Sequence, residues 1–145
     1  MASLKKFSVH AKSENCVKTI VQAKGFKIII DELESMGGTN AGANPLEYLL
    51  AALSGCLNVV GHLVAKEMGF TLRGLEIDLE GDIDPAKFMG KPTQGRAGYT
   101  AVRVTIKPDA DADRIILAKW LKAVECRCPV NDNISNSTPL KIELG

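Results

Sequence analysis

One segment most constrains the fold of this chain: in residues 45–68, apolar side chains recur at helical spacing. Asn44, Pro45 and Glu47 combine three signals of a helix start, namely a capping residue, a proline in the first turn and an acidic partner three residues after the cap. Gly69 then supplies the residue type that commonly ends a helix in the left-handed conformation. The predicted helix is about 35 Å long, which is enough to cross a small domain.

This helix is apolar over much of its circumference, which predicts that it is buried. Glu47, Asn58 and His62 interrupt the apolar run and no other segment is comparable, so a core helix is favoured over a membrane span. The 18 basic and 17 acidic side chains leave a net charge of only +1, and there are only four Phe, two Tyr and one Trp. Because nucleic-acid-binding domains carry a basic excess and base-stacking aromatics, we expect neither nucleic acid nor a membrane as a partner.

The rest of the chain reads mainly as strands. Residues 6–32 alternate apolar and polar side chains around a Lys24-Gly25 turn, which predicts a hairpin or a three-stranded meander, and the glycine-rich residues 34–44 predict a loop. The remaining predicted elements are strands at 72–83, 100–108 and 139–145, a long loop at 85–98 and an amphipathic helix at 110–127. This order predicts an α+β fold with a mainly antiparallel sheet, and the length predicts a single domain over residues 1–145.

Four cysteines are the candidates for chemistry. The first residues contain no apolar segment typical of a secretory signal, so we expect a cytoplasmic protein with reduced thiols. Cys56 lies on the apolar stripe of the long helix, behind Ser54 and Gly55, where a small ligand can approach closely. Such a thiol is a usable nucleophile only if a positive or hydrogen-bonding group lowers its pKa.

Cys128 is predicted to cap a short helix at residues 130–135, because Pro129 fits the first helical position. The free N–H groups at such a cap, together with the neighbouring Arg127, would favour a thiolate. Cys16 reads as an incidental thiol in a turn, and Cys126 as a packing residue of the preceding helix. A zinc site is disfavoured because the Cys126–Cys128 pair lacks the usual ligand separation and no second pair exists, so we expect neither a metal nor an organic cofactor.

The helix sequence Asn-Pro-Leu-Glu-Tyr-Leu-Leu-Ala-Ala-Leu-Ser-Gly-Cys (44–56), followed about seventy residues later by Cys-Pro-Val (128–130), resembles the OsmC/Ohr superfamily of thiol-dependent hydroperoxide reductases. The start of the helix is closest to the third, less characterised OsmC-like branch. The resemblance implies an intertwined homodimer, in which sheets of both subunits wrap around two long central helices.

The resemblance also implies a mechanism and a role in oxidative or osmotic stress defence. Cys56 would be the peroxidatic thiolate that reduces an organic hydroperoxide, Cys128 would resolve its sulfenic acid as a disulfide, and an external dithiol would reset the pair. Glu47 would correspond to the catalytic glutamate. It precedes Cys56 by nine residues, which points the two to opposite sides of the helix about 13.5 Å apart. A role as capping partner of Asn44 is the alternative.

The arginine that characterised members place before the long helix has no counterpart here, since the first arginine is Arg73. Lys24, Lys27, Arg96 and Arg127 are the candidate replacements. This departure leaves an alternative function open: a non-peroxidatic OsmC-like binder of a small apolar or sulfur-containing molecule. A purely structural dimer whose cysteines only pack is the third possibility.

Overall fold

The computed structural model of the chain describes residues 3–145, in two compact units. The first unit ends at Leu49 and the second covers Leu50–Gly145, so the boundary falls inside the long helix α1 (Pro45–Met68). The first unit holds three strands and a short 3-10 helix, and the second holds two long strands and the helices α2 and α3.

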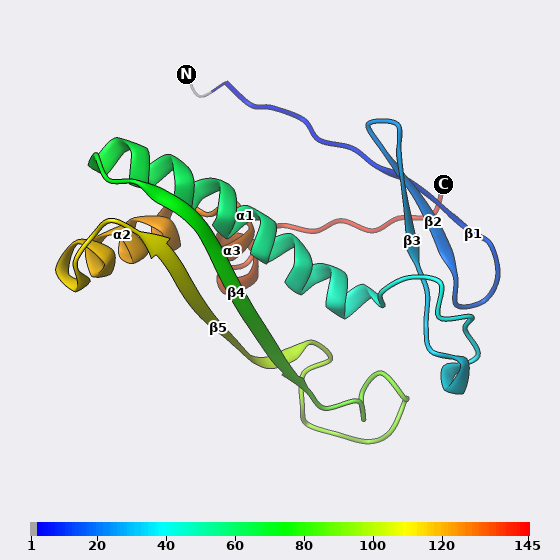
Figure 1. Cartoon of the computed structure of the whole chain (residues 1–145). Coiled ribbons are helices and arrows are strands. Elements are labelled where there is room, and N and C mark those ends of the chain that lie inside the picture. Colours follow the sequence, from blue (N-terminus) through cyan, green and yellow to red (C-terminus); the bar gives the residue numbers. More distant parts are fainter. Residues whose placement is uncertain (1–2) are drawn as a thin grey trace. The chain divides into compact units, whose positions relative to one another are not determined.

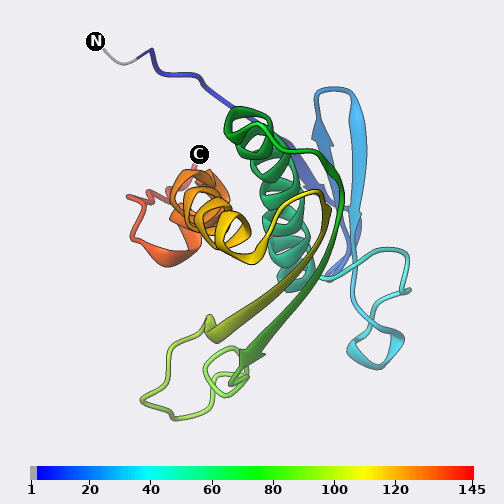
Figure 2. The same cartoon turned by 60° about the vertical axis from the view of Figure 1, so that its left-hand side comes forward.

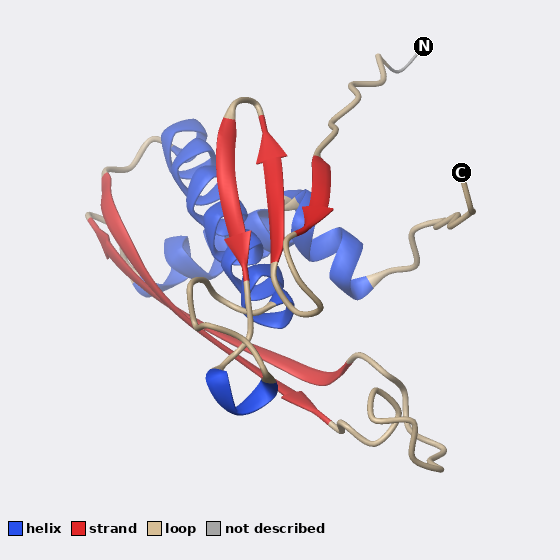
Figure 3. Ribbon diagram, turned by 90° about the vertical axis from the view of Figure 1, so that its right-hand side faces the viewer, coloured by secondary structure: helices blue, strands red, loops and turns tan. Residues whose placement is uncertain are grey.

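A three-stranded antiparallel meander forms the sheet of the first unit (Figure 3). In it β1 (His10–Ser13) pairs with β2 (Thr19–Ala23), and β2 pairs with β3 (Phe26–Ile30). Lys24 and Gly25 form the β2–β3 turn with φ angles of 48° and 82°, the left-handed backbone that such a two-residue turn requires. The meander expected from residues 6–32 is confirmed, although β1 begins only at His10.

The loop between β3 and α1 is organised around a buried carboxylate. Asp31 has no exposed surface, and its oxygens accept hydrogen bonds from the Thr39 hydroxyl (2.7 Å) and from the backbone N–H groups of Glu32, Thr39 and Ala41. The Thr39 hydroxyl and the Ala41 N–H hold the pKa of this carboxyl well below its ordinary value, because they stabilise the charged form. Glycine is needed at Gly38, since a Cβ there would lie 1.9 Å from the Glu32 carbonyl oxygen. The segment 34–44 is a loop as expected, with one 3-10 turn, η1 (Glu34–Met36).

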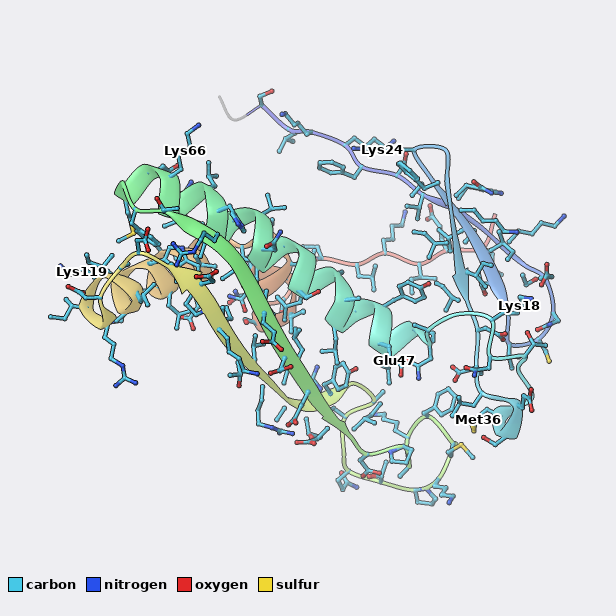
Figure 4. All side chains as sticks on the ribbon, viewed as in Figure 1. Lys18, Lys24, Met36, Glu47, Lys66 and Lys119 are labelled. Atoms are coloured by element: carbon cyan, nitrogen blue, oxygen red, sulfur yellow. The ribbon has the colours of Figure 1, made fainter. Side chains whose placement is uncertain are left out.

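Helix α1 has the predicted bounds. Asn44 and Glu47 form a reciprocal capping box, in which each backbone N–H donates to the other side chain at 2.9 Å. Glu47 therefore lies in the first turn of the helix (Figure 4). Gly69 follows the last turn with a φ angle of 78°, the left-handed conformation expected at this end.

The second unit contains a long two-stranded antiparallel ribbon of β4 (Leu72–Ile83) and β5 (Tyr99–Ala110), twisted along its length (green to yellow in Figure 1). On its polar face, exposed ion pairs connect the two strands, such as that of Lys107 with Asp78 at 2.7 Å. Its apolar face packs on the core through Leu75, Ile77, Leu79, Val102 and Ile106. The ribbon thus buries one face and exposes the other, as the alternation of apolar and polar residues in 72–83 predicted.

The core of the second unit forms between α1 and α2 (Arg114–Arg127), which lie side by side in Figure 2. Trp120 is 2% exposed, and its indole N–H donates to the backbone oxygen of Gly61 at 2.8 Å. The indole approaches so closely that a Cβ on Gly61 would lie 3.1 Å from the ring and 2.9 Å from Leu75. The buried residues of this core are Leu53, Leu57, Val60, Val64, Ala65, Trp120, Val124 and Cys128.

Within residues 3–145, only one side of α1 is buried. Val59 and Leu63, on other sides of the helix, are 67% and 47% exposed. By length and composition alone α1 could cross a membrane, but its buried residues contribute to the core of the second unit, as a core helix does.

Two expectations for the second half of the chain are wrong. The helix expected from residue 110 begins at Arg114, because β5 continues to Ala110 and the Asp113 carboxylate caps the helix by accepting the Ile116 N–H at 2.9 Å. Cys126 is exposed rather than packed, because α2 buries the helix face that carries Trp120 and Val124.

The strand expected at residues 139–145 is not formed either: within residues 3–145 this segment pairs with no other strand. Leu140, Ile142 and Leu144 keep the alternating pattern but are 82%, 87% and 101% exposed. Alternation shows which side of a strand can be buried, but a strand forms only beside a hydrogen-bonding neighbour.

Candidate functional site

Two cysteines that are 72 residues apart in the sequence meet in the second unit. The Sγ atom of Cys128 lies 2.7 Å from that of Cys56, and Cys128 donates a hydrogen bond to Cys56. Both are free thiols, Cys128 fully buried and Cys56 half-buried. The two thiols expected to work as a pair are thus brought together by the fold.

The short helix α3 (Pro129–Ser135) positions both sulfur atoms. Cys128 is its N-cap, as predicted, and accepts the backbone N–H of Asn131 at 3.4 Å. The next backbone N–H group towards the cap, that of Val130, hydrogen-bonds to Cys56. Pro129 occupies the first helical position, where its missing N–H removes no hydrogen bond. The first turn of α3 therefore donates one N–H to each sulfur.

Burial raises the pKa of the Cys56 thiol above its ordinary value. Cys128 acts in the same direction in two ways: its hydrogen bond with Cys56 favours the protonated thiol, and a second thiolate so close by would repel the first. The hydrogen bond from the Val130 N–H lowers the pKa of Cys56, but by less than burial and Cys128 raise it. Among residues 3–145, no lysine, arginine or histidine is one of the groups that shift this pKa. Cys56 therefore needs a further positive group, or a higher pH, to become a thiolate.

The four residues considered as replacements for the missing arginine lie in different parts of the structure. Arg127, next to Cys128 in the sequence, forms an exposed ion pair with Glu67. Arg96 lies in the loop between β4 and β5. Lys24 and Lys27 belong to the β2–β3 hairpin of the first unit.

The other sequence candidates lie outside the thiol pair. Glu47 is engaged in the capping box with Asn44, in the first unit. Cys16 and Cys126 are exposed thiols. In the part of the chain that the structure describes, no three His, Cys, Asp or Glu side chains are grouped so that they could hold a metal ion.

A cavity of about 520 Å³ lies in the second unit, with walls from α1, β5, α2 and α3, and the sequence did not predict it. Leu53 and Leu57, which flank Cys56 on α1, line its walls together with residues of β5 and α2. Asn131, whose backbone N–H binds Cys128, lines it too. The volume lies within the range of small-molecule sites. The cavity could not be foreseen because its walls come from four separate elements, none of which signals it alone.

Solved structures share this fold. An OsmC-like protein from Mycoplasma pneumoniae is 20% identical, with a TM-score of 0.79, and the match covers 90% of this chain and 88% of the other. An organic hydroperoxide resistance protein from Elizabethkingia anophelis, with thiocyanate bound, is 16% identical, with a TM-score of 0.65 and coverage of 92% and 90%. The organic hydroperoxide resistance protein OsmC from Legionella pneumophila is 14% identical, with a TM-score of 0.66 and coverage of 92% and 91%. At these identities the similarity shows a common fold.

No curated protein sequence matches the chain. The family of OsmC-like proteins matches residues 38–143, a segment that includes the start of α1, both cysteines of the pair and the β4–β5 ribbon. The match covers well over half of the chain, and the fold agrees with it, so this chain belongs to the family of OsmC-like proteins.

Proposed function

We propose that this protein is a thiol-dependent peroxidase that reduces organic hydroperoxides through Cys56 and Cys128. The observation that carries the proposal is the 2.7 Å separation of the two sulfur atoms, each bound by an N–H group of α3. The structural similarity to organic hydroperoxide resistance proteins supports it. The cycle requires a reducing compartment such as the cytoplasm, and would serve stress defence.

The proposed reaction has three steps. The Cys56 thiolate attacks the terminal peroxide oxygen: an S–O bond forms, the O–O bond breaks, and the alkoxide leaves as an alcohol after taking up a proton. The Cys128 sulfur then attacks the Cys56 sulfenic acid, so that a disulfide forms and water leaves. Finally an external dithiol reduces the disulfide through a mixed disulfide and is itself oxidised.

The test is turnover of cumene hydroperoxide with dithiothreitol. Cys56→Ser is expected to abolish turnover, and Cys128→Ser is expected to slow it and to leave Cys56 as sulfenic acid. Cys16→Ser and Cys126→Ser are matched controls, because both cysteines are exposed and lie outside the pair. Unchanged turnover in Cys56→Ser would disprove the proposal.

We propose that Glu47 contributes to this reaction in addition to capping α1. Glu47→Gln separates the two roles, because glutamine can still accept the Asn44 N–H but carries no charge. A lower kcat with unchanged thermal stability supports a catalytic role. An effect seen only in Glu47→Ala, accompanied by loss of stability, would assign Glu47 to capping alone.

We further propose that the working form is a homodimer. The support is the apolar surface that the single chain leaves uncovered, including Leu140, Ile142 and Leu144 at the C-terminus and Val59 and Leu63 on α1. Light scattering coupled to size exclusion is expected to give twice the mass of one chain. A monomeric mass at micromolar concentration would refute the dimer.

A non-peroxidatic binder is the second candidate. The raised pKa of Cys56, with no cation acting on it among residues 3–145, favours this candidate, since a protonated thiol reacts slowly with peroxides. Mass spectrometry after sub-stoichiometric peroxide distinguishes the two functions. A fast Cys56–Cys128 disulfide supports the peroxidase, and slow, scattered oxidation supports the binder.

A further inference from the structure

A single residue, Cys128, separates helix α2 from helix α3, and a proline begins α3. In a continuous helix the backbone N–H of residue 129 would bind the carbonyl oxygen of Glu125, four positions earlier. Pro129 has no N–H, so this carbonyl in the last turn of α2 lacks its ordinary partner. The side-chain amide of Asn131 takes the place of that N–H and donates to the Glu125 oxygen at 2.9 Å.

The same change of direction frees two backbone N–H groups for the sulfur atoms. In a continuous helix, the N–H groups of Val130 and Asn131 would also bind carbonyls four positions earlier. The extended backbone of Cys128, with φ −79° and ψ 111°, interrupts the helix. The Val130 N–H instead binds Cys56, and the Asn131 N–H binds Cys128 at 3.4 Å. Asn131 thus binds the end of α2 with its side chain and one sulfur of the pair with its backbone.

Apolar contacts also attach α3 to the second unit, because Val130 and Ile134 pack against its core. Such contacts are not directional, whereas a hydrogen bond fixes both a distance and an angle. Asn131 is half-buried, and its amide oxygen accepts the hydroxyl of Ser135 at 3.3 Å, which leaves the NH₂ group for Glu125. The directional link from α3 to α2 is therefore the amide of Asn131.

We infer that Asn131 is a positioning residue of the thiol pair: its amide replaces the N–H that Pro129 lacks and holds the first turn of α3 against the two sulfurs. The inference rests on the proposed function for the role of the pair, but its consequence is a property of the thiols themselves. Without the amide, the first turn of α3 is free to move away from Cys56 and Cys128. Cys56 then loses the N–H that lowers its pKa, and the two sulfurs are no longer held in place for bond formation.

Two thiol measurements test this inference in a Cys16→Ser, Cys126→Ser background. Asn131→Ala is expected to slow alkylation of Cys56 at pH 7 by about threefold, because one hydrogen bond is worth about two- to tenfold in an equilibrium constant. In glutathione redox buffers it is expected to lower the effective concentration of Cys128 towards Cys56 by about tenfold.

Two further substitutions at the same position separate the amide from the rest of the side chain. Asn131→Gln keeps an amide donor and is expected to restore part of both thiol measurements. Asn131→Ser has a polar side chain that is one bond shorter, too short for the Glu125 oxygen. It is expected to behave as Asn131→Ala does, and replaces that variant if Asn131→Ala does not fold.

Asn133→Ala is the matched control. The Asn133 amide also donates to a backbone carbonyl, but to that of Pro129 within its own helix, at 2.8 Å. Its oxygen accepts the hydroxyl of Thr138, as the Asn131 oxygen accepts that of Ser135. Both alanine variants lose one amide–carbonyl hydrogen bond, so a similar decrease in Tm is expected from each. Only Asn131→Ala is expected to change the two thiol measurements.

Unchanged alkylation and unchanged effective concentration in Asn131→Ala overturn the inference, and so do equal changes in Asn133→Ala. Neither measurement requires a peroxide, so the two proposals fail separately. The expected thiol changes in a protein that does not turn over cumene hydroperoxide would refute the proposed function alone. Wild-type turnover, with no thiol change in Asn131→Ala, would refute the positioning role alone.

Discussion

Joining Cys56 to Cys128 by mild oxidation is the perturbation that tests the geometry of the thiol pair most directly. The two sulfur atoms are already 2.7 Å apart and a disulfide is about 2 Å long, so bond formation requires little movement of the folded chain. The main effect of the bond is therefore expected in the unfolded state, whose freedom it restricts.

The size of the effect follows from the separation of the two residues along the chain, which is 72 positions. The chain-entropy relation gives about 4 kcal/mol of added stability at 25 °C for a loop of this length. Any strain in the folded state reduces this value, so a measured gain of about 2–4 kcal/mol agrees with the structure.

The assay is urea unfolding of the oxidised and dithiothreitol-reduced protein at equal concentration, after mass spectrometry has confirmed the bond. Oxidation is expected to raise the midpoint and to lower the m-value, because the cross-linked unfolded chain exposes less surface. Cys126→Ser is expected to keep the full gain, and Cys56→Ser to show none. An oxidised wild type that is no more stable than the reduced form would refute the geometry described for the pair.

Three further results are expected. In a variant without Cys16 and Cys126, alkylation of Cys56 at pH 7 is expected to be slower than that of free cysteine and to rise with pH, because its pKa is raised; faster alkylation at pH 7 would contradict this. Asp31→Asn is expected to lower Tm at pH 7. The folded-state pKa of Asp31 is depressed, so its charge stabilises the fold at pH values above the unfolded-state pKa near 3.9. This stabilisation is lost as the pH falls through the folded-state pKa, so the difference in Tm between wild type and Asp31→Asn is expected to disappear in acid. Gly61→Ala is expected to destabilise by about 1 kcal/mol, since about 1–3 kcal/mol of overpacking against Trp120 exceeds the gain in helix propensity; a rise in unfolding midpoint would refute that contact.

The elements that could be predicted from the sequence are those fixed by local chemistry. The capping box of Asn44 and Glu47, the terminal Gly69 and the Lys24-Gly25 turn each involve residues only a few positions apart, so their signals can be read directly. The N-cap role of Cys128 was predictable for the same reason. That Cys56 and Cys128 form a pair followed only from the family resemblance, because no local signal relates residues so far apart.

The features that could not be predicted depend on which helices and strands pack against each other in the tertiary structure. Cys126 was expected to pack, but which face of α2 is buried depends on the position of α1 and the ribbon. Residues 139–145 have the pattern of a strand but pair with no other strand among residues 3–145. The cavity also depends on tertiary packing, since four elements enclose it.

The thiol pair combines a geometry suited to bond formation with electrostatics that keep one partner protonated. The N–H groups of Val130 and Asn131 bring partial positive charge to both sulfurs, yet burial and the second thiol keep the pKa of Cys56 raised. Catalysis at neutral pH therefore requires a positive charge from outside the set of groups now acting on Cys56. A second copy of the chain or a local rearrangement can supply such a cation. The proposed dimer is thus also a candidate source of the reactivity of Cys56.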